Sequence, residues 1–199
     1  MANDFRTAVK QRRSNYDLSN QSPVSDEAIR EIVEFAVANT PSAFNSQSAR
    51  AVLLLGSQHK KFWELVRETL RGMVPEAEFE PTSRKLDSFA AGHGTVLFYE
   101  DRAVIENLQK SYPKYAAAFP GFSENSAGML QHVVWVMLRD AGLGASLQHY
   151  GNLVEERVAE EWGLDKKWYL VAQMPFGAPN SEPPVPERQP IESRVKVFS

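Results

Sequence analysis

The chain contains no cysteine. It therefore has no disulfide, no thiolate nucleophile and no Cys-based zinc or iron–sulfur site, so any redox chemistry must belong to a bound cofactor. Long hydrophobic runs are missing too. No segment approaches the roughly 20 apolar residues that span a bilayer, and the N-terminal MANDFRTAVKQRRSNY has no apolar signal core. We expect a cytoplasmic protein that does not enter the membrane.

Positive charge is not in excess, since the formal net charge is −3. Nucleic acid is therefore not expected as a partner. The histidines form no HExxH or other close metal pair, and the chain has neither a P-loop nor a GxSxG elbow. GLGAS at 142–146 lacks the third glycine of a dinucleotide fingerprint and follows a predicted helix instead of preceding one. These absences disfavour metal sites, serine hydrolysis and a Rossmann domain.

The residues that are present suit one globular domain over 1–199, because 43% are hydrophobic and 24% are charged. Apolar periodicity predicts helices at 3–13, 25–39, 62–73, 83–92, 126–140 and 153–162, and strands at 51–56, 94–101, 142–150, 167–177 and 191–198. The helix at 126–140 is apolar nearly all round, which predicts a central, buried helix. His132 on it is then a core or interface histidine. This mixture favours an α+β fold in which helices dominate.

Two proline-containing segments interrupt this pattern. Residues 72–83 read as a polar connector, and residues 178–190 are too rich in proline for regular structure. The alternating sequence IESRVKVF at 191–198 then predicts a half-apolar strand, which needs a sheet edge. Because a long extended segment precedes it, we expect this strand to reach another chain.

Two segments hold more polar groups than local structure requires. QRRSNY (11–16) places two guanidinium groups and a hydroxyl at the end of the first helix, where Arg12 and Arg13 are expected to close the last turn. They form either a monophosphate clamp or ordinary surface charge that complements the helix dipole. TPSAFNSQSARA (40–51) gathers amide and hydroxyl side chains in one loop. Such loops suit a planar heterocycle that needs a rim of donors and acceptors.

Seven motifs, in order, resemble the FMN-dependent nitroreductase family, and more narrowly its branch related to the yeast fatty-acid-repression-mutant proteins. They are RRS (12–14), PSAFNSQSAR (41–50), KLDSFAAGHGTVLFYED (85–101), NSAGMLQ (125–131), GLGASLQHY (142–150), MPFG (174–177) and PIESRVKVF (190–198). The resemblance implies an α+β, nitroreductase-like fold with a central, mostly antiparallel sheet surrounded by helices. It also implies a homodimer with FMN at the interface, in which an arm of residues 178–199 is exchanged with the partner.

The resemblance also assigns residues to FMN. The positions that match the family's cofactor contacts are Arg12, Arg13, Ser14, Pro41, Ser42, Ala43, Asn45, Gln47, Lys85, Asn125, Ser126, Gln148, His149 and Arg188. The arginines and Ser14 match the grip on the phosphate and ribityl chain, although Pro186 stands where the family often has a lysine. The loop 41–47 matches the part that reaches the flavin from the other subunit. Gln148 and His149 lie in the segment whose main-chain donor faces N5.

Lys85 matches a cation near flavin N1 and O2, where positive charge stabilises the reduced ring. A solvated surface lysine is the other interpretation of Lys85, just as His149 is alternatively a plain interface residue. The implied activity is the use of NADH or NADPH to reduce nitroaromatic or quinone-like acceptors at the flavin by a ping-pong route, with a role in oxidative stress suggested by analogy alone. The alternative is a non-catalytic protein that binds flavin or lipid for regulation.

Overall fold

The computed structural model describes residues 4–199 and has an α+β fold, as predicted. The helices are α1 (Phe5–Gln11), α2 (Asp26–Asn39), α3 (Gly56–Arg71), α4 (Phe79–Ala90), α5 (Arg102–Ser111), α6 (Phe119–Asp140) and α7 (Gly151–Trp162). The strands are β1 (Leu18–Ser19), β2 (Ala49–Leu55), β3 (Gly94–Asp101), β4 (Gly144–Ala145) and β5 (Trp168–Pro179). Short 3-10 turns lie at Ala43–Asn45, Glu76–Glu78, Pro113–Ala118 and Ile191–Ser193. Among the described helices none has the length and apolar character needed to cross a membrane.

The strands form one sheet in the order β1-β5-β3-β2, and β4 pairs separately with β5. Every pairing between these strands is antiparallel, with β3 between β2 and β5. β2 therefore lies at one edge of the sheet. Only Leu54 of β2 is fully buried, so the prediction of a buried strand near 51–56 was right about the strand and wrong about its burial.

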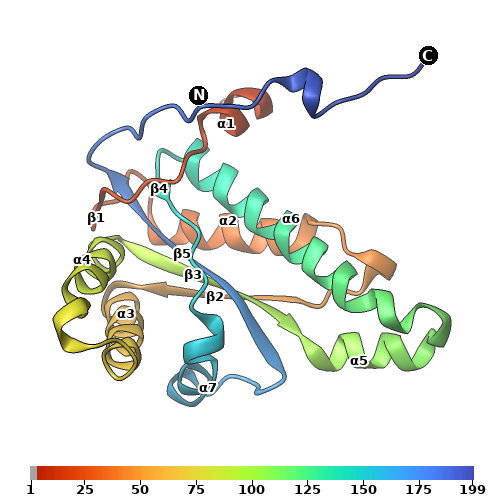
Figure 1. The fold of residues 1–199 in the computed structure, drawn as a ribbon, viewed down its shortest axis with the longest axis horizontal. Coiled ribbons are helices and arrows are strands. Elements are labelled where there is room, and N and C mark those ends of the chain that lie inside the picture. Colours follow the sequence, from red (N-terminus) through yellow and green to blue (C-terminus); the bar gives the residue numbers. More distant parts are fainter. Residues whose placement is uncertain (1–3) are drawn as a thin grey trace.

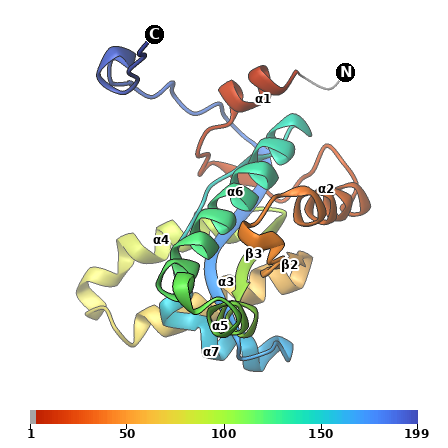
Figure 2. The same cartoon turned by 90° about the vertical axis from the view of Figure 1, so that its right-hand side faces the viewer.

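Helices cover both faces of this sheet (Figures 1 and 2). Apolar side chains of α3, α4 and α7 pack on one face against Leu97 and Tyr99 of β3. Those of α2 and α6 pack on the other face against Val96 and Phe98. Because successive strand residues point to opposite faces, a strand buried on both sides reads as a continuous apolar run, which is how β3 appears in the sequence.

β5 contains one irregularity that matters for the site. Phe98 pairs with Ala172 and Tyr99 pairs with Leu170, so Val171 is an extra residue in β5. Such a bulge exchanges the faces to which the following side chains point. Beyond it, Ala172 packs on the α2–α6 face, while Gln173 lies opposite Leu97, whose side chain packs on the α3–α4–α7 face.

Several predicted boundaries need correction. Ser25 caps α2 as expected, its hydroxyl accepting from the Ala28 N–H at 3.2 Å. The predicted connector 72–83 is wrong in part, because α4 begins at Phe79 and holds Pro81 in its first turn, where proline costs no hydrogen bond. α6 starts seven residues earlier than the predicted 126, and only Gly144–Ala145 of the predicted strand 142–150 is a strand. Residue 3 of the first predicted helix lies outside the described residues.

The two strongest disagreements concern surfaces left uncovered in a single chain. Met129 and His132 of α6 are exposed, so the prediction of a wholly buried helix and the core interpretation of His132 are wrong. The predicted strand 191–198 is absent, since a 3-10 turn at Ile191–Ser193 is followed by irregular chain whose Phe198 is 93% exposed. An extended strand needs a neighbour to satisfy its backbone, and the C-terminal segment extends away from the sheet past α1 (Figure 1).

Candidate functional site

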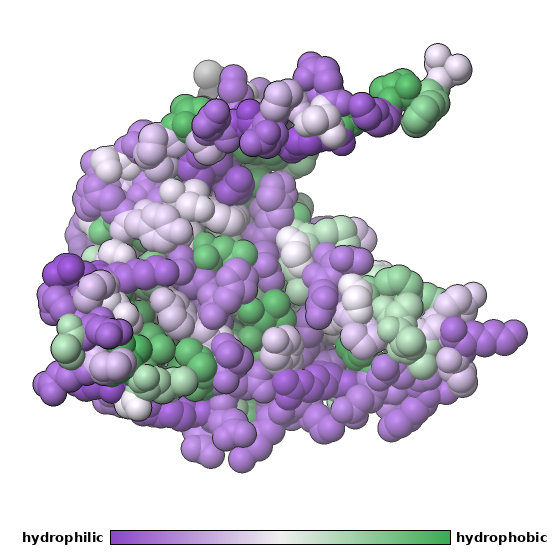
Figure 3. Space-filling view, in the orientation of Figure 1, coloured by the Kyte–Doolittle hydropathy of each residue, from purple (hydrophilic) through white to green (hydrophobic). Residues whose placement is uncertain are grey.

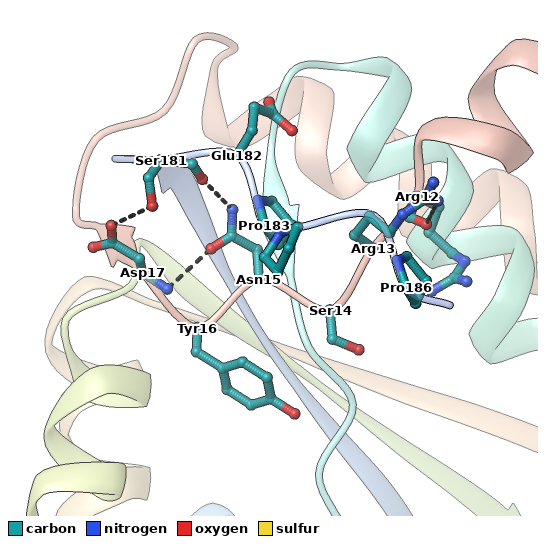
Figure 4. A pocket seen from close by; sticks show the side chains of 11 residues that line it. Arg12, Arg13, Ser14, Asn15, Tyr16, Asp17, Ser181, Glu182, Pro183 and Pro186 are labelled. Carbon is teal, nitrogen blue, oxygen red and sulfur yellow. Dashed lines mark hydrogen bonds between the residues drawn. The ribbon is translucent and has the colours of Figure 1, made fainter. Parts of the chain in front are cut away.

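A cavity of about 540 Å³ lies where the chain leaves α1 and runs beside the C-terminal segment (Figure 4). We call it the arginine cavity; it is lined by Arg12, Arg13, Ser14, Asn15, Tyr16, Asp17, Ser181, Glu182, Pro183, Pro184 and Pro186. Asn15 holds its two walls together. Its backbone N–H donates to the Ala145 carbonyl at 2.9 Å, and its side-chain amide donates to the Ser181 carbonyl at 2.8 Å.

The two arginines of this cavity are held in place without being neutralised. Arg12 and Arg13 were predicted to lie in the last turn of the first helix. This prediction is wrong, because α1 ends at Gln11, Arg12 is its C-terminal capping residue, and Arg13 follows. The Arg12 guanidinium stacks over the Trp135 ring at 4.4 Å, and burial, followed by the charge of Arg13, lowers its pKa. The Nε atoms of both arginines are buried without a hydrogen-bond partner, and neither arginine forms an ion pair with the described residues.

Uncompensated, part-buried guanidinium groups favour an anionic ligand. The planar fork of arginine matches phosphate oxygens, and a dry surrounding strengthens the attraction. Glu182 also lines the cavity, but its carboxylate pairs with Arg139 at 2.9 Å. QRRSNY thus places two guanidinium groups without a carboxylate partner at a cavity, and its interpretation as a phosphate clamp stays a prediction.

The loop 41–47 is strained. Phe44, Asn45 and Gln47 have positive φ angles of 57°, 50° and 47°. Asparagine tolerates this region, whereas Phe and Gln pay a steric cost there, and such strain concentrates at ligand sites. Part of the cost is offset by the Gln47 N–H, which donates to the Ser42 hydroxyl at 3.0 Å. Pro41, Ser42, Asn45 and Gln47 line a cavity of about 630 Å³ that they share with Ser126 of α6.

A buried carboxyl group fixes the end of this loop. Glu100 of β3 is 5% exposed and accepts hydrogen bonds from Ser48 at 2.5 Å and from Ser123 of α6 at 2.6 Å, both on Oε2. Its Oε1 atom is buried with no partner. Burial raises the pKa of Glu100 above its ordinary value, against the opposing effect of the two hydroxyl donors.

The segment 146–150 runs beside β5 as a short extended edge. The Ser146 N–H donates to the Pro175 carbonyl at 3.3 Å and the Gln148 N–H to the Gln173 carbonyl at 2.7 Å. The Tyr150 N–H donates to the side-chain oxygen of Gln173, also at 2.7 Å. Alternate N–H groups therefore face β5, and that of the exposed His149 has no acceptor among residues 4–199.

Aromatic rings connect this segment to the arginine cavity. Phe89 of α4 lies between Tyr16 and Tyr150, with ring centroids 6.2 Å and 6.5 Å away. The exposed Lys85 places its Nζ 5.8 Å from the centroid of the Phe89 ring. Burial, followed by the influence of Tyr16, raises the pKa of Tyr150. The aromatic rings thus link Lys85 and the segment 146–150 to Tyr16 of the arginine cavity.

The structure brings the predicted residues together in separate groups. Arg12, Arg13 and Ser14 share the arginine cavity, while Arg188 lies outside it in another cavity, of about 700 Å³, against α1. The loop 41–47, with Ala43 in its 3-10 turn, and Ser126 form a group of their own, and Asn125 is exposed. Figure 3 shows a wide recess between the C-terminal segment and the opposite end of the molecule.

The residues of these sites that the sequence analysis did not assign to a ligand include Tyr16, Glu100, Trp135 and Gln173. For two of them a signal was available, since Gln173 lies inside the otherwise apolar run YLVAQMPF and Glu100 directly follows the apolar run VLFY. A polar residue buried in a strand needs a partner, which makes it worth examining as a possible site residue. Tyr16 and Trp135 carry no such signal, because aromatic residues are usually part of a core.

Comparison with known proteins identifies the family of the chain. The model of the nitroreductase family matches residues 9–178, and the chain belongs to that family. Two proteins of Saccharomyces cerevisiae, HBN1 and nitroreductase FRM2, are 35% and 33% identical over 94% and 98% of this chain, covering 93% and 97% of their own lengths. Nitroreductase CinD from Lactococcus lactis, solved with 4-nitrophenol, superposes with a TM-score of 0.90 at 36% identity, covering 98% of this chain and all (100%) of that one. The predicted family and fold are thereby confirmed.

Proposed function

We propose that the protein is an FMN-dependent oxidoreductase that uses NADH or NADPH to reduce nitroaromatic and quinone-like compounds by a ping-pong route. Bound FMN would supply the ring atom that takes up hydride from one substrate and passes it to the next. A single open pocket then serves both substrates, which agrees with the absence of a Rossmann fingerprint. Nitroreductase CinD, described with 4-nitrophenol, supports the substrate class by analogy.

The observation that carries this proposal is the arginine cavity. Its two part-buried guanidinium groups have unpartnered Nε atoms and no carboxylate of their own, which suits a monophosphate ester. Lys85 supplies a cation for the end of the ring that becomes negatively charged, and the free His149 N–H supplies a main-chain donor. The strained loop 41–47 of the partner subunit would complete the site.

The homodimer belongs to the same proposal. β2 offers a sheet edge without a neighbour in the described chain, and the C-terminal segment presents Val195, Val197 and Phe198 with exposed fractions of 53%, 84% and 93%. An open sheet edge and, elsewhere in the chain, an exposed apolar C-terminal segment together favour strand addition from a second copy. Sedimentation of the FMN-loaded protein at micromolar concentration should give a dimer; a monomer that retains FMN would contradict this assembly.

The test of function is spectroscopic. The purified protein with FMN should show a bound-flavin spectrum that bleaches on anaerobic addition of NADH or NADPH and returns when a nitroaromatic compound is added. Oxidation of NADH or NADPH no faster than with free FMN, despite bound flavin, would overturn the catalytic proposal and favour the non-catalytic alternative. Failure to bind FMN at all would overturn the cofactor assignment.

A further inference from the structure

Gln173 is a completely buried amide in the middle of β5, with no part of its surface exposed. Its Oε1 accepts the Tyr150 N–H at 2.7 Å, while its Nε2 is buried without any hydrogen-bond partner. An unpaired buried amide group costs roughly 1–3 kcal/mol, and an apolar side chain of similar size would avoid this cost. The presence of an amide at this position is therefore best explained by the hydrogen bond that its oxygen accepts from the Tyr150 N–H.

That oxygen replaces a backbone acceptor that the bulge removes. Gln148 and Gln173 exchange two backbone hydrogen bonds, of 2.7 Å and 2.9 Å. In a regular antiparallel ladder the next N–H, two residues along, would donate to the carbonyl of Val171. Val171 is the extra residue of the bulge, and the side chain of Gln173 takes over its role.

The result is that Gln173 makes hydrogen bonds on both sides of His149. The N–H groups of Gln148 and Tyr150 point to Gln173, so the N–H of His149 between them points away from β5, as alternation in an extended chain requires. Just after this segment the backbone approaches β5 closely, since a Cβ at Gly151 would lie 1.9 Å from the Leu170 carbonyl oxygen, so only glycine fits there.

We propose that Gln173 is a positioning residue, which fixes the main-chain N–H of His149 as the donor to the N5 acceptor of the flavin. This inference rests on the proposed function and specifies which main-chain N–H group of the segment 146–150 faces the flavin. Gln148 cannot be that donor, because its N–H is already bonded to Gln173, and the side chain of His149 is not required. Gln173 acts only through the backbone it holds and does not touch the reacting atoms.

The test compares FMN with 5-deaza-FMN, which has a C–H group in place of N5 and so accepts no hydrogen bond there. The wild-type apoprotein should bind FMN at least tenfold more tightly than 5-deaza-FMN. Gln173→Leu should reduce that ratio to about twofold or less. For a two-electron couple, tenfold weaker binding of the oxidised flavin relative to the reduced flavin corresponds to a midpoint potential about 30 mV higher.

Two variants separate positioning from general damage. Thr95→Val disturbs a different buried polar group on the neighbouring strand and should leave the FMN to 5-deaza-FMN ratio unchanged. Gln173→Glu keeps a carbonyl oxygen for the Tyr150 N–H, because complete burial favours the neutral carboxyl, and should retain most of the ratio. An unchanged ratio in Gln173→Leu would overturn the inference while leaving the proposed function intact.

Amide hydrogen exchange of the wild-type protein tests the same point without a variant. In the apoprotein the amides of Gln148 and Tyr150 should exchange slowly and that of His149 quickly. FMN should slow exchange at His149 at least tenfold. Binding of FMN with no change at His149 would overturn the inference, and absence of FMN binding would instead remove the proposed function on which it rests.

Discussion

A buried polar cluster on the sheet differs from two separate buried polar groups, Glu100 and Gln173, in whether every polar atom has a partner. In the cluster of His59, Thr95 and Trp63, the Ala90 carbonyl can only accept, so His59 Nε2 carries the hydrogen and donates to it at 3.2 Å. Nδ1 of the neutral ring then accepts from the Thr95 hydroxyl at 2.8 Å, and that hydroxyl accepts from Trp63 Nε1 at 2.9 Å. Glu100 and Gln173, by contrast, each keep one buried atom unpaired.

This difference separates residues that only stabilise the fold from residues that support a ligand site. The satisfied cluster lies between α3 and β3, where it adds to the core and offers nothing to a ligand. The unsatisfied groups lie directly behind the loop 41–47 and the edge 146–150, the two segments assigned to FMN. Changes in the cluster of His59, Thr95 and Trp63 should alter folding alone, and changes at Gln173 should alter flavin binding.

The largest effect is expected from Thr95→Val. This substitution leaves the Trp63 N–H and the His59 Nδ1 atom buried without partners, and each loss costs roughly 1–3 kcal/mol. Urea denaturation should show the free energy of unfolding lowered by about 4 kcal/mol. Thr82→Val, where the hydroxyl makes no hydrogen bond with the described residues, is the matched control and should change it by about 0.5 kcal/mol or less. Similar losses in both variants would contradict the role given to the cluster.

The second prediction concerns pH. Burial lowers the pKa of His59 from 6.5 to about 4, so between these values the unfolded chain binds a proton that the folded chain does not. Stability is therefore complete above pH 6.5 and falls by about 3 kcal/mol as the pH drops toward 4. Carboxylates titrate in the same range, so the measurement is the difference between wild type and His59→Gln. Parallel stability curves for the two proteins would show that His59 is not buried in its neutral form.

The sequence predicts elements whose burial shows in their own residues better than segments whose conformation depends on a neighbouring strand. Regular elements such as Gly94–Asp101 were predicted to the residue, because a strand buried on both faces has an unbroken apolar run. The segments 142–150 and 191–198 were predicted as strands and are mostly irregular in one chain, since a strand depends on a neighbour that local sequence does not specify.

The candidate site was predictable only in part. RRS and PSAFNSQSAR stand out by composition and by family resemblance, and the first forms one cavity. Gln173 was not predicted, because its role depends on a bulge two residues earlier, at Val171, that exchanges the faces of β5. Tertiary effects of this kind leave no periodic pattern in a single sequence.

The third prediction concerns the affinity of the arginine cavity for FMN. Arg12→Ala removes a guanidinium from the arginine cavity and should weaken FMN binding about 100-fold, roughly 2.7 kcal/mol. Lys10→Ala, which removes an exposed charge from the last turn of α1, is the control and should change the affinity about twofold or less. Equal effects of the two substitutions would mean that the cavity acts through general charge alone.

Arg188 extends this experiment. In the single chain it lies against α1, outside the arginine cavity, so its assignment depends on a rearrangement of the C-terminal segment in the dimer. If Arg188 joins the phosphate grip, Arg12→Ala combined with Arg188→Ala should bind FMN distinctly more weakly than Arg12→Ala alone. Identical affinities for the single and double variants would remove Arg188 from the site.

The smallest effect is expected at Glu100. Because burial raises the pKa of this carboxyl, the folded chain holds a proton that the unfolded chain releases, and stability is lost as the pH rises above the unfolded value. Its charged neighbours act in opposite directions, since Arg50 lowers and Asp101 raises the pKa of Glu100, and these two pair with each other at 3.0 Å. Glu100→Gln keeps an oxygen for both serine hydroxyls and removes the buried charge.

That substitution should therefore raise the free energy of unfolding by about 1 kcal/mol at pH 8, and its effect should shrink as the pH is lowered, because the raised pKa favours the neutral carboxyl. If Glu100 only anchors Ser48 and Ser123, FMN affinity will stay the same in Glu100→Gln. If the unpaired Oε1 instead serves the strained loop 41–47, FMN affinity will fall although the protein is more stable. Only a loss of FMN affinity would show that Glu100, like Gln173, combines an unsatisfied buried atom with a role in flavin binding.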